Sequence, residues 1–387
     1  MLEILFWACC ALVFWTYIGY PVVMLVRGRH APLERHSPHG EMPKVTAVLA
    51  VRNAATLLPD RLENLLTQDH PAELLDVVVV LNGCTDESRA VAEAFARPSA
   101  GRVRVLESPA GEGKAGALNL GVRSADGDVV VFADARQQFA GDVVRRLSAV
   151  AVQHGVGAVS GRLEIAAGEA AAAEGMRRYW SLETRLRLAE SRTGSVMGVT
   201  GAVYAVRRDA FVPIPPGTIL DDVYLPLQIA LAGRRVLLEP RAIAYDRATP
   251  SQGSEYRRRV RTLLGNLQLV RLDPRLVRPW RNPVFVRFVS HKLLRVFTPL
   301  FLIGILVSGL LLDGALYRTV AFAEVAVLLL GAIGLAFGIR PLAVPAALLM
   351  IQIAALDALF RPRRTAGQVW HDGTPPVASS AKEPWRH

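Results

Sequence analysis

The stretch Val129-Val130-Val131-Phe132-Ala133-Asp134-Ala135-Arg136 decides the fold class that the sequence predicts. Its apolar, β-favouring run is typical of a strand covered on both faces, as in a parallel sheet flanked by helices. Ligands of open α/β sheets bind beyond the carboxyl ends of the strands, so Asp134 lies where a functional site is expected. An aspartate that only forms a turn after a strand is also common, so other parts of the chain must decide its role.

Strand and helix patterns alternate around this stretch, from Lys44 to about Val159. Further strands are predicted at Val45–Val51, Asp76–Leu81, Val103–Leu106 and Val156–Ser160, and helices at Ala54–Thr67, Asp86–Ala96, Lys114–Arg123 and Val143–Gln153. Repeated β-α-β units imply a right-handed, doubly wound parallel sheet. Beyond Gly161 the repeat breaks down, and a long helix is expected at Ala170–Glu190.

Composition narrows the classes of partner. The chain has 387 residues, which allows one large domain or two smaller ones. Its net charge of +11 comes almost wholly from arginine and favours anionic partners such as phosphates or the inner membrane surface. We do not expect nucleic acid, because 51% of the residues are apolar and form membrane-length runs. The cysteines, at positions 9, 10 and 84, exclude a disulfide framework and have no metal-site spacing.

An apolar segment near the start predicts a membrane anchor. Ile4–Val26 carries no formal charge, and as a helix of roughly 34 Å it would cross a bilayer. Glu3 precedes it and Arg27 follows it, unlike the basic start of a cleavable signal peptide. We therefore expect residues 1–27 to be a signal anchor, with Met1 outside and the following chain in the cytoplasm.

The last third of the chain is also hydrophobic. Val296–Leu312, Thr319–Ile339 and Leu342–Phe360 are candidate spans, so residues 296–360 are expected to form transmembrane helices. A basic segment, 271–295, precedes them and is expected to lie near lipid head groups. Three spans would leave the C-terminus outside, whereas the arginines at 361, 363 and 364 favour the inside, so its side stays open. Residues 365–387 have the composition of a disordered tail.

One short motif has two interpretations. Gly111–Gly116 fits G-x-G-x-x-G, the dinucleotide-binding fingerprint, and Asp134 ends the following strand. The motif lies in the third β-α unit, however, and four residues separate it from its strand. The segment does not fit a P-loop either. Ser108 stands where the first Gly of that motif is required, and Ala115 stands where Ser or Thr is required. A dinucleotide enzyme is thus the weaker hypothesis, and Lys114 is expected to contact a phosphorylated ligand.

A set of acids is expected at strand or loop ends: Asp86, Asp134, Asp221 and Asp222. Acids and an anionic ligand can share a site if a divalent cation joins them. Mg²⁺ and Mn²⁺ take hard oxygen ligands, typically one or two carboxylates and substrate phosphates. Asp134 would then hold the metal, while Asp222 or Asp221 remains available as a base.

The order of these motifs resembles one family. The matching segments are Val48–Asn53, Asn82–Asp86, Gly113–Asn119, Asp134–Arg136, Gly201–Arg208, Leu220–Asp222 and Arg258–Thr262. In this order they are similar to the motifs of the membrane-bound glycosyltransferases of family 2, the group that includes cellulose, chitin and hyaluronan synthases. The resemblance covers roughly Lys44 to Gln268, and the flanking apolar segments fit it too.

The resemblance implies the GT-A fold, an α/β fold with a mostly parallel sheet and flanking helices, for a cytoplasmic domain at 44–270. It implies an inverting transfer from a nucleotide-sugar, expected to be a UDP-sugar, with Mg²⁺ or Mn²⁺ on Asp134. Asp222, beside Asp221, would be the general base, and Arg261 would stabilise the leaving diphosphate. The residues implied in substrate binding are Asn53, Asn82, Asp86, Lys114, Asp134, Arg136, Gly201, Ala202 and Arg258.

Departures from the family pattern leave alternatives open. Asn82 and Arg136 each replace an aspartate, so Arg136 is expected to form a salt bridge or meet phosphate instead of metal. Thr262 replaces a tryptophan, which weakens the case for extending a long polymer and slightly favours a lipid-linked or short saccharide acceptor. We expect a multi-pass protein of the inner or plasma membrane that serves cell-envelope glycan or polysaccharide synthesis. A non-catalytic membrane scaffold of the same fold is the alternative.

Overall fold

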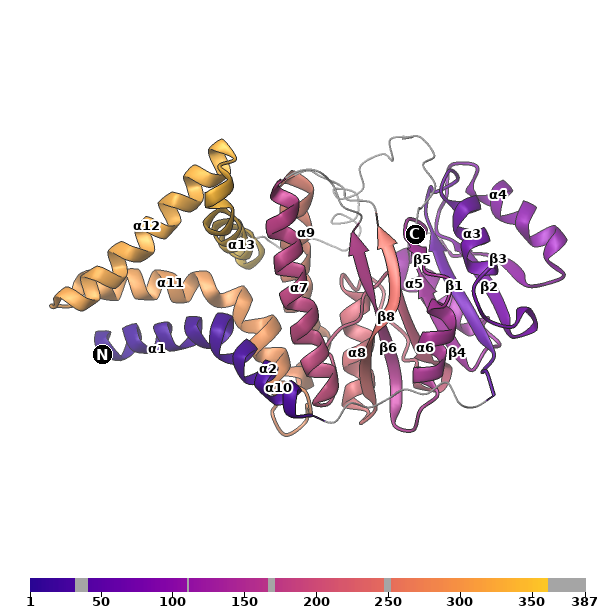
Figure 1. The fold of residues 1–387 in the computed structure, drawn as a ribbon, viewed down its shortest axis with the longest axis horizontal. Coiled ribbons are helices and arrows are strands. Elements are labelled where there is room, and N and C mark those ends of the chain that lie inside the picture. Colours follow the sequence, from indigo (N-terminus) through magenta and orange to yellow (C-terminus); the bar gives the residue numbers. More distant parts are fainter. Residues whose placement is uncertain (32–40, 110, 166–170, 247–251, 361–387) are drawn as a thin grey trace.

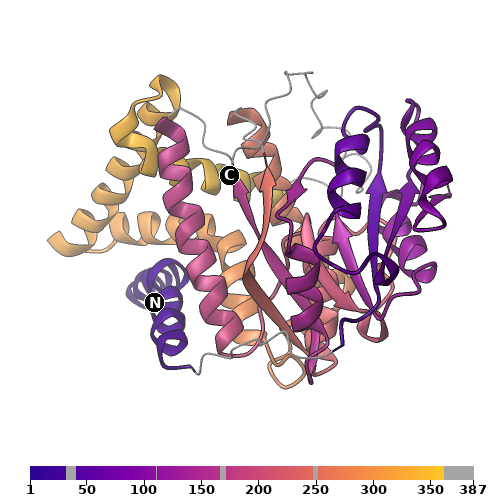
Figure 2. The ribbon, with the colours of Figure 1, turned by 45° about the vertical axis from the view of Figure 1, so that its right-hand side comes forward.

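The computed structural model describes residues 1–31, 41–109, 111–165, 171–246 and 252–360 (Figure 1). The predicted tail at 365–387 lies outside these residues. An α/β part and a group of apolar helices occupy opposite ends of the molecule, and α7 (Ala171–Arg192) stands between them in both ribbon views (Figures 1 and 2).

The α/β part is built on a single sheet. Its strands are β1 (Val45–Val51), β2 (Leu75–Leu81), β3 (Val103–Glu107), β4 (Val129–Ala133), β5 (Gln138–Phe139), β6 (Val156–Ile165), β7 (Val203–Arg207) and β8 (Arg235–Asp246). Within the described residues they form an eight-stranded sheet in the order β3-β2-β1-β4-β7-β6-β8-β5. The strands that the valine-rich runs predict are present with nearly the same bounds, because strands buried on both faces leave a continuous apolar signal.

The sheet is mixed, and more of its strand pairings are parallel than antiparallel, which confirms the expected mostly parallel sheet. Strands β3, β2, β1 and β4 run parallel, whereas β7 is antiparallel to both β4 and β6, and β5 is antiparallel to β8. An apolar strand pattern carries no information on direction, so the sequence could not show this reversal. In the β4–β7 pairing Ala133 lies opposite Val203, so the end of β4 and the start of β7 meet at one edge.

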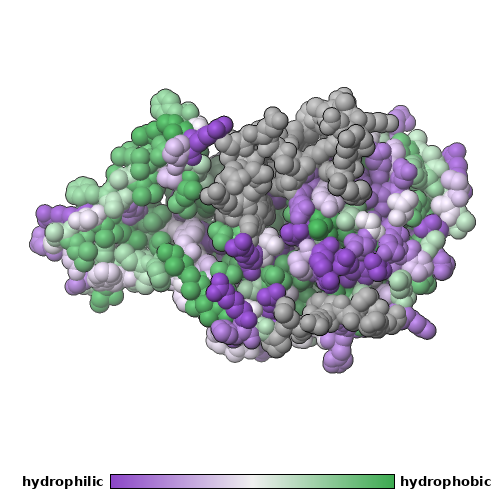
Figure 3. All heavy atoms as spheres, viewed as in Figure 1, coloured by the Kyte–Doolittle hydropathy of each residue, from purple (hydrophilic) through white to green (hydrophobic). Residues whose placement is uncertain are grey.

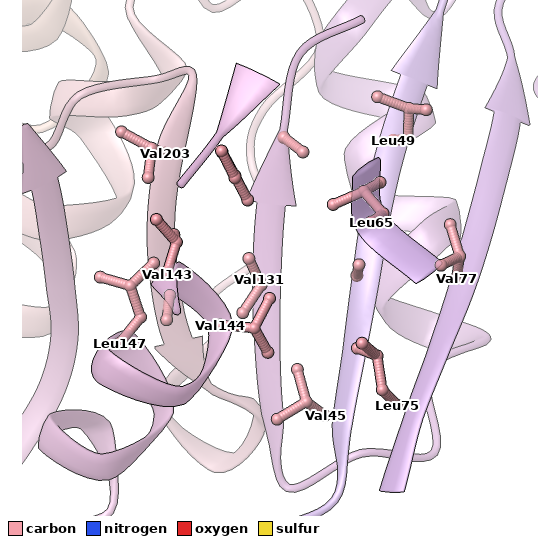
Figure 4. Packing of buried hydrophobic residues seen from close by; sticks show 14 of the residues in the cluster. Val45, Leu49, Leu65, Leu75, Val77, Val131, Val143, Val144, Leu147 and Val203 are labelled. Atoms are coloured by element: carbon pink, nitrogen blue, oxygen red, sulfur yellow. The ribbon is translucent and has the colours of Figure 1, made fainter. Parts of the chain in front are cut away.

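Helices cover both faces of the sheet. Those of the α/β part are α3 (Leu58–Leu66), α4 (Ser88–Ala96), α5 (Gly113–Arg123), α6 (Val143–Ala151), α8 (Asp221–Leu231) and α9 (Gln252–Leu272). On one face, side chains of α3 and α6 such as Leu65 and Leu147 pack on alternate strand residues such as Val131 (Figure 4). On the other face, α5 and α8 pack on the residues between them, such as Val48 and Val130. This double cover explains the unbroken apolar strands.

The apolar helices form the other end of the molecule. They are α1 (Leu2–Phe14), α2 (Tyr20–His30), α10 (Phe285–Phe288), α11 (Leu294–Leu311), α12 (Ala315–Phe337) and α13 (Ala343–Phe360). Single π-helical turns, at Trp15–Gly19 and Val289–Leu293, join α1 to α2 and α10 to α11. Helix α1 lies along α11, and α13 packs on α9, which ties the apolar group to the α/β part.

Four helical stretches among the described residues are long and apolar enough to cross a membrane: Leu2–His30, Phe285–Leu311, Ala315–Phe337 and Arg340–Phe360. Their outward side chains make this end of the molecule hydrophobic (Figure 3). The second stretch begins at Phe285, inside the segment 271–295 that the sequence assigns to a basic region outside the spans. Arg287, Lys292 and Arg295 lie within the first part of this stretch, and the helix continues from there into apolar residues. Which side each end faces stays a prediction.

Gly127 provides a test of how tightly β4 enters the sheet. A Cβ at this position would lie 2.6 Å from the Thr46 nitrogen and 2.8 Å from the Val45 carbonyl carbon, and backbone atoms cannot move aside cheaply. We expect Gly127→Ala to lower the free energy of unfolding by about 1–3 kcal/mol, as overpacking does. The measurement is denaturant unfolding of the purified chain in detergent. Gly141→Ala is the control, since no atom lies within 4 Å of its added Cβ. Equal stability of the two variants would contradict this packing.

Candidate active site

Three predicted site residues from separate elements meet at the carboxyl edge of the parallel strands. Lys114 is the second residue of α5, Asp134 directly follows β4, and Asp221 opens α8. The Lys114 ammonium donates a hydrogen bond to Asp134 Oδ1 at 3.0 Å and lies 3.7 Å from Asp221 Oδ2. Burial alone would lower the pKa of Lys114, but the charges of Asp134 and Asp221 outweigh it, so this pKa lies above its ordinary value.

Asp222 lies beside this cluster, against the segment that precedes β7. A Cβ on Gly201 would lie 3.3 Å from Asp222 Oδ2, tighter than ordinary contact, so the glycine leaves room for this carboxylate. The backbone nitrogen of Val199 donates to the Asp222 carbonyl oxygen at 2.8 Å and holds the two segments together. Burial, and next the charge of Asp221, raise the pKa of Asp222, although Lys114, Arg261 and Lys292 counteract them. A raised pKa suits a carboxylate that must accept a proton.

The two predicted arginines of α9 differ in their placement. Arg261 Nη2 lies 3.4 Å from the carbonyl oxygen of Ile219, in the loop that leads into Asp221, and its charge acts on Asp222. Arg258 is exposed, one turn earlier on the same helix. The geometry therefore supports a role for Arg261 at the acidic cluster, and the role of Arg258 stays a prediction.

A second group of predicted residues forms a rim where β1 and β2 end. Asn53 has a left-handed backbone (φ +49°), and its Oδ1 accepts a hydrogen bond from the Thr85 nitrogen at 2.7 Å. Asp86 accepts hydrogen bonds from the Ala55 nitrogen at 2.9 Å and the Ser88 hydroxyl at 2.6 Å. The backbone nitrogen of Asn82 donates a hydrogen bond to the carbonyl oxygen of Val51 at 2.8 Å. The two loops are thus tied together and present polar side chains at the ligand-binding edge of the sheet.

Arg136 is not part of the acidic cluster. Its Nη2 donates to Asp246 Oδ2 at 2.7 Å, and Gln137 donates to the same oxygen at 2.9 Å. The expectation that Arg136 forms a salt bridge instead of holding metal fits this pairing. Its assignment to substrate binding stays a prediction. Ala202 is buried directly before β7, and its assignment to substrate binding stays a prediction.

The residues of this cluster fit a metal ion that is held mainly by the phosphates of a bound substrate and only in small part by the protein. No group of three or more His, Cys, Asp or Glu residues in the described part of the chain could hold an ion by itself. Asp134 offers one partly exposed carboxylate, with Lys114 on only one of its oxygens. Mg²⁺ and Mn²⁺ commonly take one or two protein carboxylates and complete their shells with phosphate oxygens and water. The site is therefore suited to a metal–diphosphate complex and not to a preformed metal cage.

Three residues that the sequence did not single out surround the acids. Tyr204 is buried in β7, stacked on Phe132 at a centroid distance of 4.5 Å, and its hydroxyl has no hydrogen-bond partner among the described residues. Burial and the charges of Asp221 and Asp222 raise the pKa of Tyr204. Arg187 of α7 and Lys292 of the π-helical turn bring positive charge to the side of Asp222. Tyr204 lies inside the matching segment Gly201–Arg208, whereas nothing in the motif order marks Arg187 or Lys292. A lysine inside an apolar helix is nevertheless a signal in itself.

Comparison with known proteins agrees with this geometry. The family model of glycosyl transferase family 2 matches residues 46–213. An N-acetylglucosaminyltransferase of Azorhizobium caulinodans is 27% identical over 219 residues, which cover 52% of this chain and 54% of the relative. A beta-monoglucosyldiacylglycerol synthase of Nostoc sp. is 26% identical over 54% of this chain and 45% of its own length. The chain thus spans about half the length of these curated relatives.

A solved structure supports the fold over nearly the whole chain. The mannosyltransferase PcManGT from Pyrobaculum calidifontis, in complex with GDP-Man and Mn²⁺, superposes with a TM-score of 0.70 at 23% identity. The match covers 93% of this chain and 99% of that one, so it includes the apolar helices. Residues 46–213 thus match glycosyl transferase family 2, and the chain has the GT-A fold.

Proposed function

We propose that the protein is a membrane-bound glycosyltransferase that moves a sugar from a nucleotide-sugar to an acceptor hydroxyl, with inversion at the anomeric carbon. The observation that carries this proposal is the convergence of Lys114, Asp134, Asp221 and Asp222 at one edge of the sheet. A metal-binding carboxylate and a carboxylate with a raised pKa are the two acids that such a transfer needs.

The donor would lie along the carboxyl ends of β1, β2 and β4. Asn53, Asn82 and Asp86 offer hydrogen-bonding groups for the nucleoside at the rim. Lys114 and Arg261 supply fixed positive charge for the diphosphate, and a guanidinium can hold phosphate oxygens in a bidentate manner. A UDP-sugar is our first candidate. The solved relative binds GDP-Man, so guanosine donors belong in the test.

Asp134 would hold Mg²⁺ or Mn²⁺ together with the donor diphosphate. When bound, such an ion offsets the negative charge that develops on the leaving group. Support for it comes from the partly exposed carboxylate of Asp134 at this edge and from the Mn²⁺ in the solved relative.

Asp222 would act as the general base. The acceptor oxygen forms a bond to the anomeric carbon while the bond from that carbon to the diphosphate oxygen breaks, and the hydroxyl proton passes to Asp222. A single displacement inverts the configuration. The charge of Asp221 favours proton uptake by its neighbour, and Arg261 stabilises the departing diphosphate from α9.

The setting favours a membrane-associated acceptor. The apolar helices and the basic residues before them support a multi-pass protein with its catalytic domain on the cytoplasmic side. Relatives named as an N-acetylglucosaminyltransferase and a beta-monoglucosyldiacylglycerol synthase suggest a saccharide or a lipid acceptor in the cell envelope.

Asp222→Asn tests the proposed chemistry. The amide keeps the shape of the side chain but cannot take the proton, so we expect kcat to fall by about 10²–10⁴-fold with nucleotide affinity little changed. The measurement is sugar transfer by the full chain in native membranes, with radiolabelled UDP- and GDP-sugars and separation of lipid-extractable product from polymer. Asp60→Asn, at an exposed site on α3, is the matched control. Normal turnover by Asp222→Asn, or no transfer from any donor by the unmodified chain, would contradict the proposal.

Asp134→Asn tests the metal assignment. Loss of the carboxylate should abolish the increase in nucleoside diphosphate affinity that Mn²⁺ produces, because one protein ligand is removed. Calorimetric titration of UDP and GDP with and without Mn²⁺ measures this difference. If the variant keeps the full Mn²⁺ dependence, another group holds the ion.

The pH dependence of kcat should report the raised pKa of Asp222. A base must be ionised, so we expect activity to decline as the pH falls through that pKa, at a higher pH than an ordinary aspartate with a pKa of about 3.9 would give. Asp221→Asn removes a charge that raises the Asp222 pKa, so the acidic limb should move to lower pH. Rate profiles of both proteins between about pH 4 and about pH 8 decide the matter. An unmoved limb would show that Asp221 does not tune the base.

A further inference from the structure

The π-helical turn Val289–Leu293 carries two ionisable residues at the start of an otherwise apolar helix. His291 Nε2 lies 2.9 Å from Glu183 Oε1, and its Nδ1 lies 2.9 Å from Glu190 Oε1. Both glutamates belong to α7, so the turn is fixed to the helix that stands beside the sheet. Single π-helical turns are frequent at functional sites, because the extra residue re-aims the neighbouring side chains.

Lys292 is the next residue after His291 in this turn. Among the described residues, none forms a hydrogen bond or an ion pair with its ammonium group, although the side chain is partly buried. The nearby cations are held differently: Arg187 donates to the Gly198 carbonyl and the Ser160 hydroxyl at 3.0 Å, and Arg295 pairs with Glu183 at 3.7 Å. The carboxylate of Glu183 acts on Lys292, but it is shared with His291 and Arg295. A partly desolvated ammonium beside two guanidiniums is costly unless a further anion joins it.

This cationic group borders the proposed base. Arg187 binds the carbonyl of Gly198 and the hydroxyl of Thr200, and the backbone between them, at Val199, holds Asp222. Asp222 interacts electrostatically with Lys114 on the side of the donor and with Lys292 on the side of the apolar helix. An anion at Lys292 would therefore lie near the proposed base.

The same helix leads from Lys292 to an apolar surface. Leu300, Ile303 and Val307 follow on α11 and are exposed. A charged side chain within an apolar helix that turns toward protein commonly marks a substrate path. A ligand that bridges Lys292 and this surface must combine an anionic group with a hydrocarbon chain.

We propose that Lys292 and Arg187 form the site for an acceptor phosphate, and that the acceptor is a lipid whose hydroxyl is carried beside that phosphate. The inference rests on the proposed function and narrows its acceptor class. The phosphate stays intact: the acceptor hydroxyl forms the bond to the anomeric carbon, its proton passes to Asp222, and the donor diphosphate leaves.

The test compares three acceptors offered to the full chain in detergent. They are dioleoylphosphatidylglycerol, dioleoylglycerol and water-soluble glycerophosphoglycerol, and the readout is labelled glycolipid or glycoside. We expect transfer to the anionic lipid, and Lys292→Met should raise its KM by about tenfold or more, as loss of a charged hydrogen bond does. Lys292→Arg should keep most of the affinity, and Arg281→Met, at an exposed position before α10, should change nothing.

Several outcomes would overturn this site. They are equal or better use of the neutral lipid, a preference for the soluble phosphate, transfer to none of the three, or an equal effect of Lys292→Met on both lipids. Mn²⁺-dependent binding of nucleoside diphosphate is measured in parallel. If binding is retained, such a result refutes the acceptor site alone, whereas loss of both binding and transfer refutes the proposed function.

Discussion

The ammonium group of Lys114 lies between the carboxylates of Asp134 and Asp221, and the arrangement of the acids depends on it. Two like charges about 4 Å apart repel by about 4 kcal/mol at an effective dielectric constant of about 20, so acids do not gather without a cation. Lys114 can reach them because α5 packs closely on the sheet: its Gly121 leaves no room for a Cβ beside Val48. On our proposal, a metal–diphosphate complex binds at this edge, where Lys114 already offsets much of the negative charge of the acids.

Strand β7 runs antiparallel to β4, and this direction brings the residues around Asp222 to the site. Pairing of Val203 with Ala133 brings the segment before β7 to the end of β4, and Gly201 then admits the Asp222 carboxylate. Helix α7, which is linked to that segment through Arg187, also binds His291 of the apolar helix through Glu183 and Glu190. A chain of direct contacts thus joins the apolar helices to the proposed base. An acceptor from the membrane would meet the donor from the cytoplasm at this junction.

Much of this arrangement could be predicted from the sequence because its signals are local. Valine-rich runs gave the strands, and Val45–Val51 has the predicted bounds, since residues buried on both faces must all be apolar. The order of the motifs indicated Asp134, Asp222 and Lys114 as site residues. The direction of β7 could not be predicted, because side-chain alternation is the same in either direction. Lys292 was missed because its significance comes from Glu183 and Arg187 of α7, roughly a hundred residues away, and such contacts leave no periodic pattern.

The central claim is that Asp134 and Asp222 serve one donor in one site. Anomalous scattering from Mn²⁺ in crystals of the full chain grown with a nucleoside diphosphate tests it most directly. The account predicts a manganese peak in contact with the Asp134 carboxylate and the diphosphate on the same side of the sheet as Lys114 and Arg261. A peak away from Asp134, or a nucleotide bound where the Asp222 carboxylate cannot approach its diphosphate, would contradict it.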